Sequence, residues 1–295
     1  RAGALRVGDV TGLFRQWWVP AGRPPAEGTY VAYDARAMLA VLVLAAHRAG
    51  TPVIGADPGG GAPADRGIQD TLAARGVLDT SVLWAEGEPA PEAATTGTGA
   101  ATAATAAVPR PRPPEHWRAG TLATVTTHDL PPTAARLSGT HLAVRHELGL
   151  VDTSLPAARA ADAVQVGAWL DLLDRLRLLP DGRADERSVI TGLYRFLART
   201  PARLVGVWLP DAAGDRRPPH VPGTGAEYPN WRLPVADPDG RTLLLEELAD
   251  SPRTHRLLAE VAREIRGRAE ADDDADPGGP ADGAGAGAAA GEPAP

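Results

Sequence analysis

The chain has 295 residues, enough for one large domain or two smaller ones, and a formal net charge of −7 at pH 7. Seven acidic residues and no basic one follow position 269, so the remaining 30 acids balance the 30 basic residues and the body is neutral. A neutral body without a basic face disfavours nucleic-acid binding. The absence of cysteine excludes disulfides, thiolate metal sites and a cysteine nucleophile, and it suits a reducing cytoplasm.

The hydrophobic runs do not predict a membrane protein. The longest uninterrupted apolar run, residues 37–46, is about half the length of a membrane-spanning helix. The first residues do not form an apolar signal segment. We therefore expect a cytoplasmic protein without a membrane partner. Because the chain begins with arginine and not with methionine, we also expect it to be a fragment of a longer protein.

Residues 1–84 alternate short apolar runs with helical patterns. Asp34 precedes the first helical pattern and is the residue type that caps a helix N-terminus. The patterns predict strands at 5–7, 52–55 and 80–84, and helices at 37–49 and 68–75. Strands and helices that alternate at this interval are typical of βαβ units, so we predict an α/β fold built on a parallel sheet or barrel.

The remainder of the chain divides into three segments. Residues 85–114 are a low-complexity run of Ala, Thr, Gly and Pro, which predicts an exposed insertion because it cannot bury enough apolar surface to form a core. Residues 115–269 return to ordered patterns, with Trp169 at the centre of one buried helical stripe. These patterns predict strands at 121–127 and 204–209, and helices at 130–147, 160–179, 186–198, 242–249 and 253–268. Residues 270–295 predict a disordered acidic tail.

Four of the predicted strand ends carry an aspartate: Asp9, Asp57, Asp129 and Asp211. Parallel α/β folds bind their ligands at the carboxyl ends of the strands, so these carboxylates are candidate site residues. The alternative is that each aspartate caps the turn or helix that follows it. The adjacent Trp17 and Trp18 are candidate sugar-stacking residues; because consecutive side chains diverge, we expect one of them to lie in the core.

Several motifs, taken together, resemble one known family. They are ALRVGDVTGLFRQWW (4–18), PVIGADPG (52–59), TSVLW (80–84), TTHDLPPT (126–133) and PGTGAEYPNWR (222–232). In this order they resemble the 4-α-glucanotransferases, the amylomaltase or disproportionating-enzyme family of glycoside hydrolases. The resemblance covers most of residues 4–269 outside the low-complexity run. It implies the C-terminal portion of a (β/α)₈ TIM barrel with extra helices, an α-1,4-glucan or maltooligosaccharide as ligand, and no cofactor.

The resemblance also implies a retaining mechanism, which needs a nucleophilic and an acid/base carboxylate roughly 5–5.5 Å apart. The family's nucleophile position is Gly8 in this chain, and its acid/base position is Ala56, so both carboxylates are missing. The third carboxylate of the family, which steadies the distorted sugar in the transition state, is retained as Asp129. Asp9 and Asp57 are poor substitutes, because consecutive strand side chains point to opposite faces.

Other residues of the resemblance are expected to bind the sugar. They are Arg6, His128, Asp57 and His220, the last of which stands where the family has asparagine. We therefore expect a catalytically inactive family member that retains affinity for α-1,4-glucan, with its missing barrel half as a further partner. The alternative is a non-catalytic interaction or regulatory domain that uses the barrel only as a scaffold. His141 and His146 are five residues apart, which does not place them on one helical face, so no metal site is expected.

Overall fold

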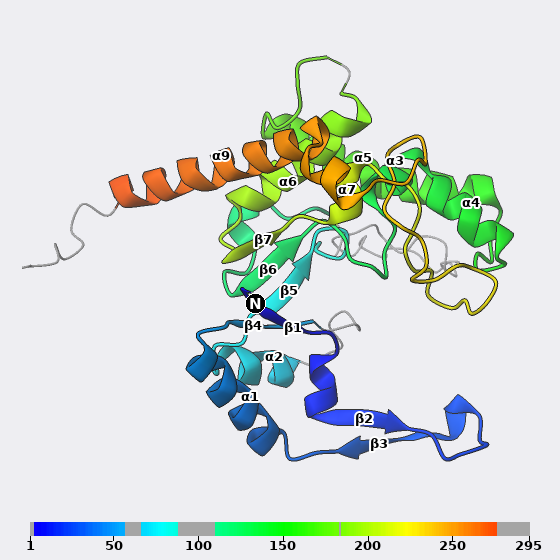
Figure 1. Cartoon of the computed structure of the whole chain (residues 1–295), viewed down its shortest axis with the longest axis vertical. Coiled ribbons are helices and arrows are strands. Elements are labelled where there is room, and N and C mark those ends of the chain that lie inside the picture. The colour runs from blue at the N-terminus through cyan, green and yellow to red at the C-terminus, as the bar shows by residue number, and fades with distance from the viewer. Residues whose placement is uncertain (1–2, 57–65, 88–109, 183, 276–295) are drawn as a thin grey trace, which may run out of the picture.

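The computed structural model describes residues 3–56, 66–87, 110–182 and 184–275, which form an α/β fold (Figure 1). Five short strands are parallel: β1 (Leu5–Val7), β4 (Val53–Gly55), β5 (Asp79–Val82), β6 (Thr121–Thr124) and β7 (Leu204–Gly206). These five strands confirm the predicted ones: β1 has the predicted bounds, and the other four are shorter by one to three residues.

The five parallel strands form one array in chain order. β1 pairs with β4, and β5, β6 and β7 pair in that order. A bridge between Ile54 and Leu78 joins the two groups. At this join the backbone N–H of Gly55 donates to the Leu78 carbonyl at 2.7 Å. Consecutive parallel strands in this order are what a segment of a (β/α) barrel contains, and the described residues contain no closed barrel.

Helices cover the outer face of the array. Two of them, α1 (Ala35–Ala49) and α2 (Arg66–Ala73), pack over β1 and β4. Asp34 is the N-cap of α1, as predicted: its carboxylate accepts a hydrogen bond from the Ala37 N–H at 3.1 Å. The helix ends at Gly50, whose φ of 59° is the left-handed conformation that favours glycine.

The larger core lies under the helices of the second half of the chain. These are α3 (Thr133–Ser138), α4 (Thr140–Glu147), α5 (Leu155–Arg175), α6 (Glu186–Arg199), α7 (Leu209–Ala213), α8 (Leu245–Ala249) and α9 (Pro252–Ala275). Trp169 of α5 and Phe196 of α6 are fully buried there, with ring centroids 5.2 Å apart in an edge-to-face contact. The predicted stripe on α5 is therefore confirmed as a core face.

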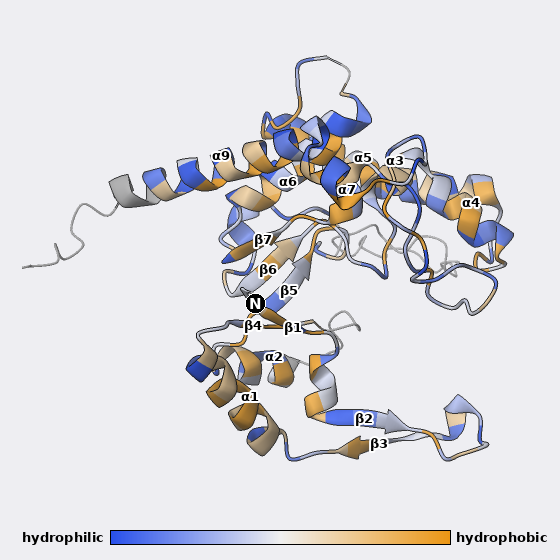
Figure 2. Ribbon diagram, viewed as in Figure 1, coloured by the Kyte–Doolittle hydropathy of each residue, from blue (hydrophilic) through white to orange (hydrophobic). Residues whose placement is uncertain are grey.

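Some helix boundaries differ from the predicted ones for local reasons. The helix expected over 130–147 is two helices, because the chain turns at Gly139 with a φ of 69°. α5 begins at Leu155, five residues early, because the Ser154 side chain caps it. α9, which alternates hydrophilic and hydrophobic surface in Figure 2, continues to Ala275 and so enters the segment expected to be a tail. Residues 88–109 and 276–295 lie outside the described part of the chain.

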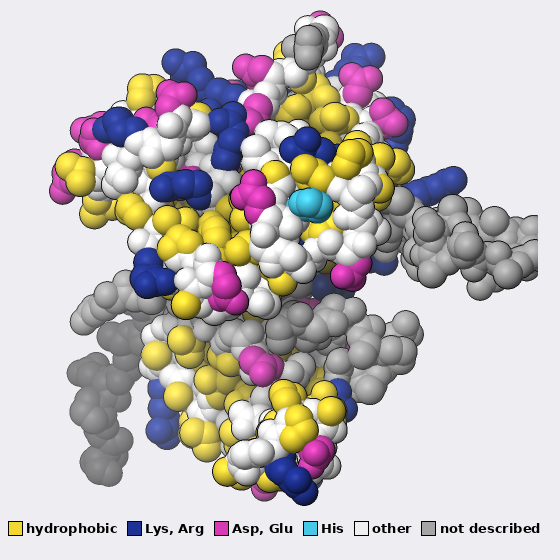
Figure 3. Space-filling view, turned by 90° about the vertical axis from the view of Figure 1, so that its right-hand side faces the viewer, with side chains coloured by type: hydrophobic (Ala, Val, Ile, Leu, Met, Phe, Trp, Pro, Cys, Tyr) yellow, Lys and Arg dark blue, Asp and Glu magenta, His cyan; other side chains and the backbone are white. Residues whose placement is uncertain are grey.

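The hairpin formed by β2 (Arg15–Trp18) and β3 (Thr29–Ala32) was not expected from the sequence. It extends away from the parallel strands (Figure 1). The expectation that Trp17 or Trp18 lies in the core is wrong, because the two residues are 47% and 56% exposed. On the face that carries the hairpin end, hydrophobic side chains gather in patches between charged ones (Figure 3).

Among the described helices, none is both long and apolar enough to cross a bilayer.

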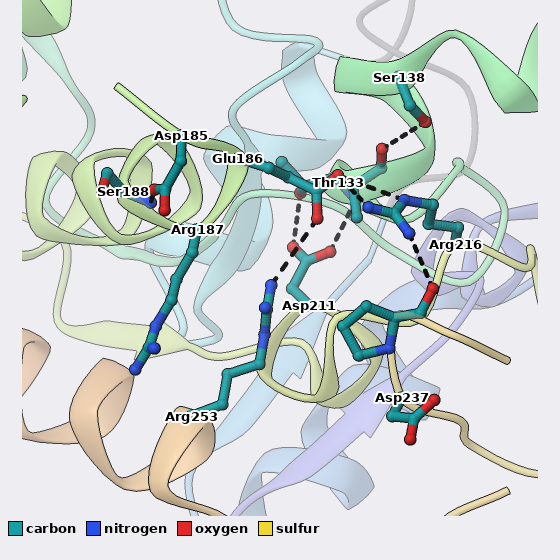
Figure 4. A network of polar contacts seen from close by, with 12 residues as sticks. Thr133, Ser138, Asp185, Glu186, Arg187, Ser188, Asp211, Arg216, Asp237 and Arg253 are labelled. Atoms are coloured by element: carbon teal, nitrogen blue, oxygen red, sulfur yellow. Dashed lines mark hydrogen bonds and ion pairs between the residues drawn. The ribbon is translucent and has the colours of Figure 1, made fainter. Parts of the chain in front are cut away.

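The interpretation of Asp211 as a residue at a strand end is also wrong. β7 ends at Gly206, and Asp211 lies inside α7 with 1% of its surface exposed. Its carboxylate accepts hydrogen bonds from the Thr133 N–H at 2.7 Å and the Thr133 hydroxyl at 2.6 Å (Figure 4). It also accepts one from the Tyr194 hydroxyl at 2.9 Å. Asp211 therefore ties α3 and α6 to α7, and burial raises its pKa from 3.8 to about 6.

We expect Asp211→Ala to lower the free energy of unfolding by about 2–4 kcal/mol at pH 5, because it leaves buried donors of Thr133 and Tyr194 without an acceptor. Asp239→Ala, in an exposed turn, is the matched control and should change stability by about 0.5 kcal/mol or less. Because the folded-state pKa of Asp211 lies above the unfolded value, its contribution to stability falls as the pH rises through both values. Urea denaturation should therefore show the gap between wild type and Asp211→Ala narrowing from pH 4 to pH 7; a widening gap would contradict this account.

Candidate functional site

Two of the positions singled out in the sequence, Gly8 and Ala56, lie side by side at the carboxyl ends of β1 and β4. The register pairs Val7 with Gly55, and the Ala56 N–H donates to the Val7 carbonyl at 2.9 Å. Neighbouring strands are about 4.8 Å apart, and alternate residues share a face. Gly8 therefore lies on the same face of the sheet as Arg6, and Ala56 lies beside Gly8 on the neighbouring strand. Neither position carries a polar side chain.

The surroundings of these two positions differ. Gly8 is exposed, its φ is not left-handed, and a Cβ built on it would meet no atom within 4 Å. Ala56 is only 4% exposed. A carboxylate would therefore have free space at Gly8, whereas at Ala56 it would have to displace neighbouring atoms.

The carboxylate of Asp9, one residue beyond Gly8, is already hydrogen-bonded within the protein. Its Oδ1 accepts hydrogen bonds from the Thr11 hydroxyl at 2.6 Å and from the Gly12 N–H at 3.2 Å. These contacts cap the short helix η1 (Val10–Leu13), which agrees with the alternative that the aspartate caps a turn. The other neighbouring acid, Asp57, lies outside the described residues.

Asp129 lies between two imidazoles. His220 Nδ1 is 2.9 Å from Asp129 Oδ1, with the ring N–H donating, and His128 Nε2 lies 3.2 Å from Asp129 Oδ2. The Trp231 ring stacks on His220 at 5.1 Å between centroids and at an angle of 20°, and it also contacts His128 at 5.1 Å. We call these four residues the Asp129 cluster. Its carboxylate is fixed in orientation yet remains 48% exposed.

Trp231 is the member of this cluster that the sequence did not single out. It is 63% exposed and has a φ of 61°, a conformation that non-glycine residues rarely adopt. Its backbone N–H donates to the Pro219 carbonyl at 2.8 Å, and Asn230 holds the same loop by accepting from the Val221 N–H at 2.9 Å. Its sequence signal is the EYPNW motif, which also carries the resemblance to the family.

Arg6 and His128 line one cavity of about 180 Å³ on the inner face of the strands. Thr80 of β5, Thr124 of β6 and Trp208 also line it. The indole N–H of Trp208 is buried and has no partner among the described residues. Arg6 thus shares a cavity with His128, while His128 and His220 both contact Asp129. Among the residues that the structure describes, no group of three metal-ligating side chains is arranged to hold a metal ion.

Comparisons with known proteins agree on one family. The profile of the family described as 4-alpha-glucanotransferase matches residues 1–238. The 4-alpha-glucanotransferase of Mycobacterium tuberculosis (strain H37Rv) is 43% identical over 266 residues, which are 90% of this chain and 34% of the relative. The enzyme of the same name from Haemophilus influenzae is 28% identical over 244 residues, 80% of this chain and 32% of the relative.

A solved structure supports the same assignment. The crystal structure of amylomaltase from Corynebacterium glutamicum superposes with a TM-score of 0.75 at 36% identity, covering 90% of this chain and 36% of that one. The α/β fold described above is therefore the fold of the matching part of the Corynebacterium glutamicum amylomaltase. The chain spans about a third of the length of the curated relatives that it matches.

The different surroundings of Gly8 and Ala56 predict different costs for restoring a carboxylate. We expect Gly8→Asp to change the free energy of unfolding by about 0.5 kcal/mol or less, because the added atoms meet nothing. We expect Ala56→Glu to lower it by about 1–3 kcal/mol, because the added atoms crowd a buried position. Urea midpoints of the two variants measure the difference; equal costs would show that Ala56 is not confined as described.

Proposed function

Because the chain belongs to the 4-alpha-glucanotransferase family of glycoside hydrolases, we propose that it binds α-1,4-glucan at the Asp129 cluster without transferring glucosyl units. The observation that carries the proposal is the pair of neighbouring strand ends at Gly8 and Ala56, where no carboxylate is present. The proposal includes the roles of Arg6, His128, Asp57 and His220 as sugar-binding residues and of Asp129 as the residue that would stabilise the transition state.

The strand geometry explains why these two positions matter. In a retaining mechanism one carboxylate forms a glycosyl-enzyme, while the other protonates the leaving oxygen and later deprotonates the acceptor hydroxyl. The two groups must lie roughly 5–5.5 Å apart, close to the spacing of about 4.8 Å between adjacent strands. Gly8 and Ala56 have this arrangement but lack the functional groups. In a serine protease, the loss of a comparable catalytic unit costs about 10⁶-fold in rate.

Within the part of the chain that the structure describes, the neighbouring acids do not offer a replacement pair. Asp9 would have to give up its hydrogen bonds to Thr11 and Gly12 to act as a nucleophile. Asp129 could serve as one carboxylate, but a single group cannot be bonded to the sugar and deprotonate the acceptor at the same time. The chemistry left to Asp129 is to accept hydrogen bonds from sugar hydroxyls, beside the exposed face of Trp231.

A second candidate function is that of a non-catalytic interaction domain. The β2–β3 hairpin favours it, because its aromatic side chains are exposed: Trp17 contacts Tyr30 edge-on at 5.0 Å, and Arg15 lies over the Tyr30 ring at 4.7 Å. Aromatic and arginine side chains are enriched at the centres of protein interfaces. This function requires no sugar at the Asp129 cluster.

Affinity electrophoresis in gels that contain amylose separates the two candidates. We expect the chain to be retarded, and we expect Asp129→Asn and Trp231→Ala each to weaken the apparent affinity by about tenfold, the effect of losing one charged hydrogen bond or one stacking contact. Trp18→Ala is the control, because it removes an exposed tryptophan outside the cluster. Free migration of the wild type would favour the interaction domain, and loss of retardation in Trp18→Ala alone would place the sugar on the hairpin.

Restoring both carboxylates tests the loss of catalysis. We expect the unmodified protein not to release glucose from maltotriose, and the double variant Gly8→Asp with Ala56→Glu to recover measurable transfer. Either single change should recover little, because the two groups act as a unit. The matched control is Gly8→Asn with Ala56→Gln, which has the same shape without the carboxylates. Turnover by the unmodified protein, abolished by Asp9→Asn or Asp57→Asn, would overturn the proposal.

A further inference from the structure

A second cavity lies between α6, α9 and the loop that follows α5. It has a volume of about 490 Å³ and shares no lining residue with the cavity of Arg6 and His128. Leu178, Leu179 and Pro180 form an apolar wall, and three arginines line the rest together with smaller polar and acidic residues. The three arginines are Arg187 and Arg195 of α6 and Arg256 of α9. A volume in this range is typical of sites for small molecules.

Arg187 is the unusual residue of this cavity. Its Nη2 is buried and has no hydrogen-bond partner within the described part of the chain. Figure 4 shows the Arg187 side chain running away from Asp185 and Glu186. Buried polar groups nearly always have a partner, so a buried guanidinium nitrogen without one at a cavity points to a ligand with acceptor oxygens.

The two acidic residues at the cavity, Asp185 and Glu260, do not balance its three arginines, so the lining carries a net positive charge. Asp185 caps α6 by accepting from the Ser188 N–H at 2.8 Å. Glu260 pairs with Arg263 at 2.7 Å. Hydrogen bonds to Ser188 lower the pKa of Asp185, and the charges of Arg187 and Arg253 lower it further, as expected in cationic surroundings.

The arginines differ in their availability. Arg195 is held by Glu264, with its Nε donating at 2.8 Å. Arg256 is exposed, and the described residues provide it with no hydrogen bond or ion pair. Arg187 and Arg256 therefore remain at the same cavity as two guanidinium groups without a hydrogen-bond partner among the described residues.

We propose that this cavity, which we call the Arg187–Arg256 cavity, binds a small phosphate monoester. A guanidinium matches a phosphate group in charge and in the spacing of its donors, and two such groups can share the oxygens of one phosphate. The apolar wall of Leu178, Leu179 and Pro180 would contact the organic group of the ester, a group that a free phosphate ion lacks. The site is separate from the Asp129 cluster, so the proposal does not depend on glucan binding.

Isothermal titration with phenyl phosphate tests the proposal. This probe carries a phosphate and an apolar body but no sugar, so the Asp129 cluster does not recognise it. We expect saturable binding to the full chain, and weaker binding by about tenfold or more in Arg187→Met and in Arg256→Met. Arg36→Met, which removes an exposed arginine of α1, is the control and should leave the affinity unchanged.

Three further measurements make the outcome decisive. Inorganic phosphate, titrated at the same ionic strength, should bind at least several-fold more weakly than the ester; equal affinity would overturn the assignment to an ester. Arg187→Lys should retain part of the affinity, because it keeps the positive charge that binds the phosphate. Thermal melts should show that each variant is folded. Absence of binding to the wild type, or unchanged affinity in a folded Arg187→Met variant, would overturn the site.

Discussion

The functional interpretation of this structure depends on the parallel pairing of β1 with β4. That pairing fixes Val7 opposite Gly55 and so brings the next residues, Gly8 and Ala56, to the same edge of the sheet. The two positions thus lie on adjacent strands about 4.8 Å apart, from which the side chains of an aspartate and a glutamate can bring their carboxyl groups to the roughly 5–5.5 Å that a retaining glycosyl transfer requires. The backbone places the two positions side by side, but neither residue has a carboxylate.

Asp129 is connected to a buried polar network. Asp129 is oriented by His128 and His220, and the loop that carries it leads directly into α3. The first residue of α3, Thr133, is in turn held by the buried carboxylate of Asp211, which also accepts from Tyr194 of α6. A buried acid therefore supports the segment that presents an exposed one.

The sequence predicted most of the fold because strands and helices of the parallel array have simple periodic patterns, and the N-cap at Asp34 is a local signal. The β2–β3 hairpin escaped prediction because neither of its faces is buried, so Trp17 and Trp18 show no alternation between apolar and polar positions. Trp231 was not predicted and Asp211 was given the wrong role, because both roles depend on partners distant in the sequence, His128 for one and Thr133 for the other. Local patterns do not contain such contacts.

Intact-protein mass spectrometry after incubation with α-maltosyl fluoride tests the central claim most directly. This activated donor forms a glycosyl-enzyme with a carboxylate nucleophile and needs little help from an acid to lose its leaving group. Our account predicts that the protein keeps its own mass, because no carboxylate is available at Gly8 and the neighbouring Asp9 is held by Thr11 and Gly12. A covalent maltosyl adduct that maps to Asp9, Asp57 or Asp129 would contradict it.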